Sequence, residues 1–180
     1  MTAAREEALR QVKALPTRYD GVLYDSRTEA RWAVFFDQLG IGFLPQEQGF
    51  LTDGVPYRPD FLLPAQALIA EVKPSFDADP DGVQKLRDLI AARGKERGVV
   101  LPAIHTGDMH LLLIAPDGKG ETWEDDRGTW LLCPAGYHYD VQPVPERGCR
   151  DCHWDGDYWY EAEAISTAYK FALSERFGRR

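Results

Sequence analysis

The sequence predicts an α/β (α+β) fold, in which a mixed central sheet is flanked by helices. Helical and extended patterns follow one another in the order helix, three strands, helix and further strands, and this order is typical of a sheet covered by helices. Residues 67–73 form a short, nearly all-apolar run that ends in charge, as expected for a strand covered on both faces. We therefore expect an αβββαβ core followed by a C-terminal extension.

Two helices are predicted in the N-terminal part of the chain. Residues 3–15 have the periodicity of an amphipathic helix, and a short extended piece at 21–24 follows. Ser26 then opens a strong helix that runs to Leu39 and stops at Gly40, because Ser favours the start of a helix and Gly its end.

A hairpin and a further helix are predicted in the middle of the chain. Extended runs at about 43–51 and 55–63 are joined across Thr52-Asp53-Gly54, and Asp-Gly between such runs is typical of a hairpin turn. Asp79-Pro80 has the composition of a helix N-cap and first helical residue. The apolar stripe expected on that helix consists of Val83, Leu86, Leu89 and Ile90.

The last predicted elements are strands at 99–105 and 109–115 and a closing helix at about 158–177. That helix is expected to turn inward its apolar residues Ile165, Ala168, Tyr169, Ala172 and Leu173. We expect residues 1–125 to form the core domain and residues 126–180 to form the extension, which is rich in Cys and aromatic residues.

Composition limits the class of protein. The chain has 180 residues and no apolar run near the roughly 18 residues that cross a bilayer. Its first residues lack the apolar core of a signal peptide, so a cytoplasmic location is expected. In that reducing compartment the three cysteines are not expected to form a disulfide framework.

The formal net charge of -8 opposes a plain electrostatic binder of nucleic acid, which would carry a basic surface. Part of the acidic excess is local, because residues 145–163 hold six Asp or Glu residues against two Arg. Carboxylates that bind a divalent cation also count as negative in this sum. The charge therefore weakens a nucleic-acid function without excluding it.

Asp60, Glu71 and Lys73 form the candidate reactive cluster. Side chains alternate along a strand, so Glu71 and Lys73 share one face, roughly 6–7 Å apart. If the hairpin strand pairs with the next strand, Asp60 reaches that face. Two carboxylates beside an ammonium group can bind Mg²⁺ and place a cation near a reacting oxygen.

Glu29 is a third candidate acid. It shares a helix stripe with Ala33 and Phe36, which should face the core, and an inward carboxylate needs a metal or a cation as partner. The alternative is structural: Ser26-Arg27-Thr28-Glu29 fits a capping box, in which Glu29 bonds back to the backbone. The two roles are compatible.

The ordered set Glu29, Pro59-Asp60 and Glu71-Val72-Lys73 resembles the PD-(D/E)XK nuclease superfamily. The stretch from Ser26 to Lys73 is similar to small nuclease-like proteins of phages and mobile elements, and distantly to the endonuclease subunit of a cut-and-paste transposition system. The resemblance covers about residues 20–115 and implies a restriction-endonuclease-like sheet. Pro74 departs from it, because many relatives carry glycine or a small polar residue there.

The resemblance implies Mg²⁺- or Mn²⁺-dependent hydrolysis of DNA phosphodiester bonds. It makes Asp60, Glu71 and the backbone carbonyl of Val72 the metal ligands, Lys73 the catalytic lysine, and Glu29 the accessory acid of the first core helix, also near the metal. DNA is then the expected partner, together with a protein partner or a second copy of the chain.

Cysteines in the extension suggest a structural zinc site. Cys149-Arg150-Asp151-Cys152 is a C-x-x-C pair, and the tetrahedral set that its spacing favours is Cys133, His138, Cys149 and Cys152. Free loop cysteines are the alternative. Nearby Trp and Tyr residues could stack on bases, although the core of a small motif is the more common role.

Two other classes of function stay open at this point. One is a non-catalytic binding or assembly module that keeps a nuclease-like fold and a structural zinc, which the acidic net charge favours. The other is a nuclease whose DNA-binding surface comes from a partner subunit, which would reconcile acidity with catalysis.

Overall fold

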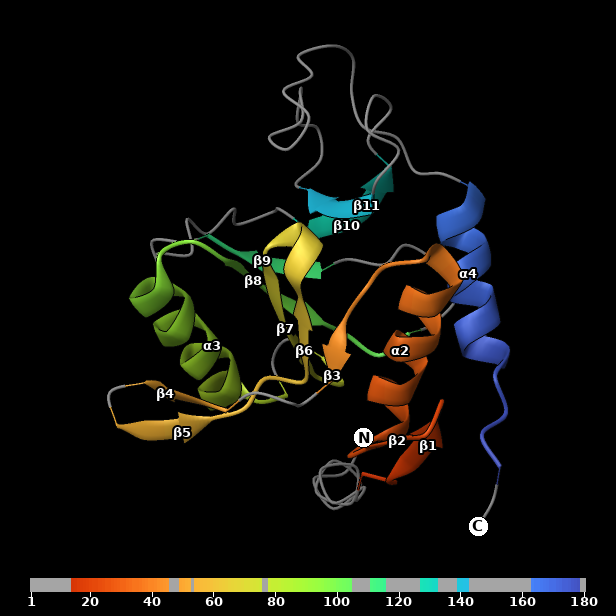
Figure 1. The fold of residues 1–180 in the computed structure, drawn as a ribbon, viewed down its shortest axis with the longest axis horizontal. Helices are drawn as coiled ribbons and strands as arrows, with labels where there is room; N and C mark the ends of the chain where they lie inside the picture. The colour runs from red at the N-terminus through yellow and green to blue at the C-terminus, as the bar shows by residue number, and fades with distance from the viewer. Residues whose placement is uncertain are drawn as a thin grey trace, which may run out of the picture.

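A seven-stranded mixed sheet forms the centre of the molecule in the computed structural model (Figure 1). The structure describes residues 14–45, 49–52, 54–75, 78–104, 111–115, 127–132, 139–142 and 163–178. In spatial order the strands of the sheet are β11 (Tyr139–Gln142), β10 (Arg127–Leu132), β9 (Leu111–Ile114), β8 (Arg97–Leu101), β7 (Leu68–Val72), β6 (Phe61–Leu63) and β3 (Leu44–Pro45). Only β7 and β8 pair in parallel, and the other neighbours are antiparallel.

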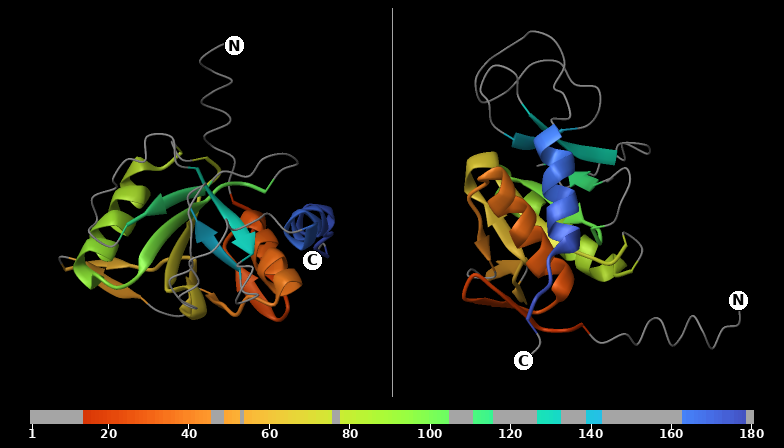
Figure 2. Two further views of the ribbon diagram at one scale, coloured as in Figure 1. Left: turned by 90° about the horizontal axis from the view of Figure 1, so that it is seen from above. Right: turned by 90° about the vertical axis from the view of Figure 1, so that its right-hand side faces the viewer.

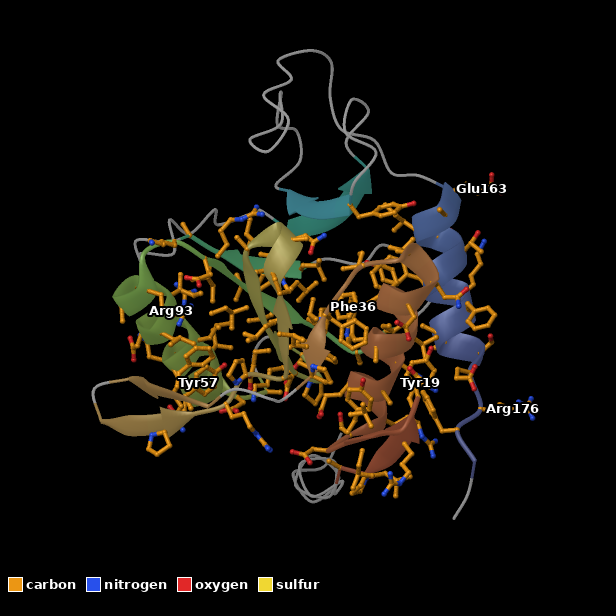
Figure 3. All side chains as sticks on the ribbon, viewed as in Figure 1. Tyr19, Phe36, Tyr57, Arg93, Glu163 and Arg176 are labelled. Atoms are coloured by element: carbon orange, nitrogen blue, oxygen red, sulfur yellow. The ribbon has the colours of Figure 1, made fainter. Side chains whose placement is uncertain are left out.

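Helices cover both faces of this sheet (Figures 1 and 2; with side chains in Figure 3). Helices α2 (Arg27–Leu39) and α4 (Glu163–Ser174) pack together on one face, and α3 (Pro80–Arg93) packs on the other. The predicted class, a mixed sheet flanked by helices, is confirmed. Within the described residues no helix is long and apolar enough to cross a membrane.

Helix α2 begins and ends as its sequence predicts. The Ser26 side chain accepts a hydrogen bond from the Glu29 backbone N–H at 3.1 Å, and Gly40 ends the helix in the left-handed conformation with φ 66°. The buried aromatic residues of α2 are Trp32, Phe35 and Phe36. Tyr169 of α4 stacks on Phe35 with ring centroids 4.4 Å apart, so aromatic packing joins the two helices.

Helix α3 joins the two parallel strands and packs against them. The Asp79 side chain accepts from the Gly82 backbone N–H at 2.9 Å, and Pro80 follows as the first helical residue. The predicted apolar stripe of α3 is buried. Beneath it, a Cβ atom built on Gly98 of β8 would lie 3.0 Å from Ile90, so the missing side chain allows close packing of helix on strand.

The two extended runs predicted at 43–51 and 55–63 are each divided into two short strands. Their inner halves, β4 (Phe50–Thr52) and β5 (Val55–Tyr57), form the predicted hairpin as a separate two-stranded sheet. Their outer halves are β3 and β6, which join the central sheet. Pro45 is the last residue of β3 and Pro59 lies between β5 and β6, and neither has a backbone N–H with which to continue the pairing.

Other boundaries also differ from the prediction. Strand β8 starts at Arg97 and stops before Pro102, whose carbonyl oxygen accepts a 2.8 Å hydrogen bond from the Trp32 indole. Strand β1 (Thr17–Tyr19), which was not predicted, pairs with β2 (Val22–Tyr24). Asp20-Gly21 between these strands, with both φ angles positive, was the overlooked hairpin signal.

Residues 3–13 of the predicted first helix lie outside the described residues, as do residues 158–162 of the predicted closing helix. Strands β10 and β11, from the predicted C-terminal extension, continue the central sheet. Helix α4 contributes Ile165, Ala168 and Ala172 to the core cluster that also contains Trp32. The short 3-10 helix η1 (Pro64–Gln66) links β6 to β7.

We expect Leu101→Ala to lower the free energy of unfolding by about 2–5 kcal/mol, because Leu101 is 0% exposed and its truncation leaves a cavity in the core. The matched control is Leu23→Ala, at a side chain 49% exposed, which should change stability by about 0.5 kcal/mol or less. Urea unfolding followed by circular dichroism measures both. Equal losses in the two variants would contradict the core position of Leu101.

Candidate active site

The charged residues of the predicted cluster meet where β7 ends. Phe61 pairs with Ala70, so Asp60, just before β6, lies opposite Glu71. Alternation along β7 places Ile69 against α3, and Glu71 therefore faces the same side of the sheet. Glu71 and Lys73 lie on the same face, as predicted, and form a direct ion pair with Lys73 Nζ 2.8 Å from Glu71 Oε1.

Lys73 is held between two carboxylates. Its Nζ also lies 2.8 Å from Asp79 Oδ2, and its side chain is only 15% exposed. Burial lowers the pKa of Lys73, but the hydrogen bonds to Asp79 and Glu71 outweigh that effect and raise it above its ordinary value. Lys73 is therefore a fixed, fully charged ammonium at neutral pH.

Glu71 is buried at the centre of the cluster, with 6% of its surface exposed. Its second oxygen, Oε2, accepts a 2.6 Å hydrogen bond from the Tyr57 hydroxyl. Burial and the neighbouring Glu71 carboxylate raise the pKa of Tyr57 far above its usual value, so Tyr57 donates this bond as a neutral phenol. Both oxygens of Glu71 are thus oriented, one by a cation and one by a phenol.

Asp60 sits in an unfavourable electrostatic position. Its Oδ2 accepts a 2.7 Å hydrogen bond from the Val72 backbone N–H, which fixes the carboxylate at the end of β7. Burial, together with the negative charges of Glu71 and Glu29, raises the pKa of Asp60 to about 8, against the opposing effects of the Val72 N–H and Lys73. A carboxyl group with so high a pKa lacks a sufficient positive partner.

Glu29 has the capping role considered for it. Its backbone N–H donates to the Ser26 hydroxyl, and its Oε2 accepts a 3.1 Å hydrogen bond from the Asp25 backbone N–H, so it caps the start of α2. Burial raises the pKa of Glu29 although hydrogen bonds from Ser26 and Asp25 oppose the shift. The same carboxylate is close enough to raise the pKa of Asp60.

Three neighbours of the cluster were not foreseen as site residues. Tyr57 could not be identified because its contact with Glu71 depends on the break between β5 and β6. Asp79 was recognised only as a helix cap, yet its second oxygen binds Lys73. A Cβ atom on Gly82 would lie 2.9 Å from both Asp79 Cγ and Lys73 Nζ, so glycine in the first turn of α3 makes room for this ion pair.

The metal chemistry that fits this arrangement is limited. Within the described residues no group of three or more His, Cys, Asp or Glu side chains forms a ready metal-ligand set. Asp60 and Glu71 remain as a pair, which suits Mg²⁺ because that ion commonly takes one or two carboxylates and fills its other positions with water and phosphate. Cys133, His138, Cys149 and Cys152, the predicted zinc ligands, lie outside the described residues.

Asp60→Asn should stabilise the protein at pH 8 by about 1–3 kcal/mol. The pKa of Asp60 is raised on folding, so the folded protein holds a proton that the unfolded chain releases, and stability falls as the pH rises from about 4 to about 8. Asparagine cannot ionise, and its oxygen can still accept from Val72. Urea unfolding at pH 5 and pH 8 should show a gain that grows with pH, whereas the exposed control Asp88→Asn should show none.

A constant loss of stability in Asp60→Asn at both pH values would contradict the charge repulsion inferred for this cluster.

Comparison of the chain with models of known protein families, with characterised proteins and with solved structures gives no match. The function of the cluster is therefore to be sought in its own geometry and charge.

Proposed function

We propose that this protein is a Mg²⁺- or Mn²⁺-dependent nuclease that hydrolyses DNA phosphodiester bonds at the cluster of Glu29, Asp60, Glu71 and Lys73. The observation that supports the proposal most directly is that Asp60 and the buried Glu71 converge beside Lys73 at the end of β7. Burial and repulsion from Glu71 and Glu29 raise the pKa of Asp60 to about 8. A divalent cation would relieve that repulsion. The order and spacing of the four residues, which resemble the PD-(D/E)XK superfamily, point in the same direction.

Asp60 and Glu71 are the carboxylates proposed to hold the metal ion, with the backbone carbonyl of Val72 as a third ligand and Glu29 as an accessory acid. When bound, the ion would supply Lewis-acid activation of a water molecule and neutralise charge on the scissile phosphate. The hydrogen bond from the Val72 N–H keeps Asp60 in place for this role. The hydrogen bond from the Tyr57 hydroxyl keeps Glu71 in place in the same way.

Lys73 is proposed as the catalytic cation. A charged ammonium beside the carboxylates can orient the attacking water and stabilise the negative charge that develops on the phosphate oxygens. Asp79 and Glu71 hold the Lys73 Nζ at 2.8 Å each, so its position is set before substrate binds. Asp79 is therefore a positioning residue in this scheme, because it acts through Lys73.

Mg²⁺ or Mn²⁺ should raise the Tm of the wild-type protein at pH 8, because an ion that binds only the folded state stabilises it. A shift of about 2–4 °C is expected for each kcal/mol of binding energy in a chain of this size. Glu71→Gln, which removes a proposed ligand's charge, should abolish most of the shift, whereas Asp88→Asn should keep it. A shift of equal size in Glu71→Gln would exclude Glu71 as a ligand.

Metal-dependent cleavage of DNA should fall by about 100-fold or more in Asp60→Asn and in Lys73→Met, which respectively remove a metal ligand and the transition-state cation. Linear, nicked, branched and single-stranded substrates, each with Mg²⁺ and with Mn²⁺, should be compared on denaturing gels. Lys170→Met is the matched control, since Lys170 is an exposed residue of α4 and its loss should leave the rate unchanged.

Cleavage that survives both site substitutions would reject the proposed site. Folded wild-type protein that cleaves none of the substrates would instead favour a nuclease that needs a partner subunit. The net charge of -8 is the observation behind that second candidate, because such a chain would gain its DNA-binding surface from a basic partner.

A further inference from the structure

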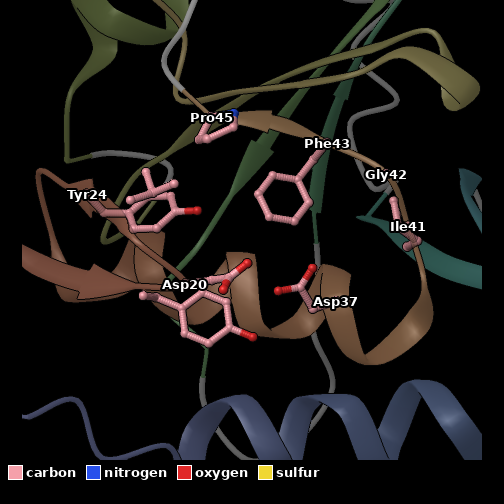
Figure 4. Close-up of a pocket in the computed structure, with 9 residues that line it drawn as sticks. Asp20, Tyr24, Asp37, Ile41, Gly42, Phe43 and Pro45 are labelled. Atoms are coloured by element: carbon pink, nitrogen blue, oxygen red, sulfur yellow. The ribbon is translucent and has the colours of Figure 1, made fainter.

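A cavity of about 310 Å³ lies between the β1–β2 hairpin, the last turn of α2 and the segment that follows that helix (Figure 4). Its lining consists of Tyr19, Asp20, Val22, Tyr24, Asp37, Ile41, Gly42, Phe43 and Pro45. The cavity is distinct from the candidate active site. Glu29 belongs to the first turn of α2 and Asp37 to the last, which separates them by about 12 Å along the helix.

The negative charge at the cavity comes from two exposed carboxylates, one of which, that of Asp37, accepts a hydrogen bond from the Tyr19 hydroxyl. Asp20 and Asp37 both line it, and the ion pairs among the described residues include neither of them. Asp37 stands in the last turn of α2, which contains no basic residue. A carboxylate at that end of a helix lies beside the negative end of the helix dipole, so the position favours a cation.

Tyr24 adds a buried polar group that points into the same space. Its side chain is only 1% exposed, and Figure 4 shows its hydroxyl directed into the cavity. The hydroxyl makes no hydrogen bond with another described residue, although its ring packs on Phe61. The hydroxyl can be reached from the cavity, so a ligand that occupies the cavity could hydrogen-bond with it.

Both tyrosines of the cavity stay neutral. Burial, followed by the nearby Asp37 carboxylate, raises the pKa of Tyr19 to about 12 and moves the pKa of Tyr24 in the same direction. Their oxygens can therefore accept a hydrogen bond from a cationic donor. Their neutral rings also offer an electron-rich face to such a cation.

The remaining walls select the kind of cation. Val22, Ile41, Phe43 and Pro45 give the cavity a substantial apolar surface. The water ligands of a hydrated divalent metal ion need polar partners, and these four apolar side chains offer none. A cation with a charged head and an apolar body would match this lining, because its head would meet the carboxylates and phenols and its body the apolar side chains.

We propose that this cavity is a binding site for a small alkylammonium ion. The ammonium group would lie between Asp20 and Asp37 and donate a hydrogen bond to the Tyr24 hydroxyl, and the alkyl chain would pack against Ile41 and Phe43. This site is independent of the proposed nuclease activity, because it shares none of the four charged residues of that cluster.

Isothermal titration calorimetry with n-butylammonium chloride tests the proposal directly. Saturable 1:1 binding with a Kd of about 1 mM or tighter is expected for the wild-type protein. Asp37→Asn should weaken binding about tenfold or more and Tyr24→Phe about threefold to tenfold, since they remove a charged and a neutral hydrogen-bond partner. Asp88→Asn removes an exposed carboxylate of α3 and should leave the Kd unchanged.

Two comparison ligands identify what the cavity recognises. Uncharged n-butanol should not bind measurably, and Mg²⁺ should not compete with n-butylammonium. The proposal is overturned if folded wild-type protein gives no saturable heat with n-butylammonium, if Asp37→Asn and Tyr24→Phe both bind it as tightly as wild type does, or if Mg²⁺ displaces it. Circular dichroism spectra show whether each variant is folded. If Asp37→Asn does not fold, the affinity of Tyr24→Phe for n-butylammonium tests the proposal instead.

Discussion

The parallel pairing of β7 with β8 determines the geometry of the candidate site. Parallel neighbours need a crossover connection, which here is α3. Because α3 starts close to the end of β7, Asp79 in its N-terminal cap meets Lys73 at the strand exit. The backbone N–H of Lys73 also donates to the Leu101 carbonyl oxygen at 3.0 Å, which extends the pairing of the two strands beyond β7. The ammonium group is thus fixed by the sheet and by the helix together.

Burying charged side chains at the end of β7 lowers the stability of the folded protein, and the fold could form without these charges. Glu29, Asp60 and Glu71 stand close together with Lys73 as the cation paired within the cluster. A structural site of this depth would be more stable with fewer acids, since replacing buried charges by apolar groups is often neutral or stabilising. Strained electrostatics of this kind are common where a protein binds an ion or a substrate.

Much of the framework followed from local sequence, because caps and periodicity are local properties. Ser26 and Gly40 delimited α2, Asp79 and Pro80 the start of α3, and the apolar run before Lys73 gave β7. Alternation along β7 also predicted that Glu71 and Lys73 share a face, and the structure adds the direct ion pair between them. The division of the hairpin runs was not foreseen, because it depends on which backbone groups find partners in a second sheet. For the same reason the bond from Tyr57 to Glu71 could not be derived.

Apart from Glu29, the residues of the cluster come from segments that are near one another in the chain. Eleven positions separate Asp60 from Glu71, and Lys73 and Asp79 are six apart, so little loop-closure entropy is lost when these residues meet. Helix α4, by contrast, reaches α2 from the far end of the sequence. We expect the β6–β7 pair and the start of α3 to form early in folding, with docking of α4 as a later and slower step. The carboxylates of Asp60 and Glu71 then come together while the chain is still free to bind a cation that neutralises them.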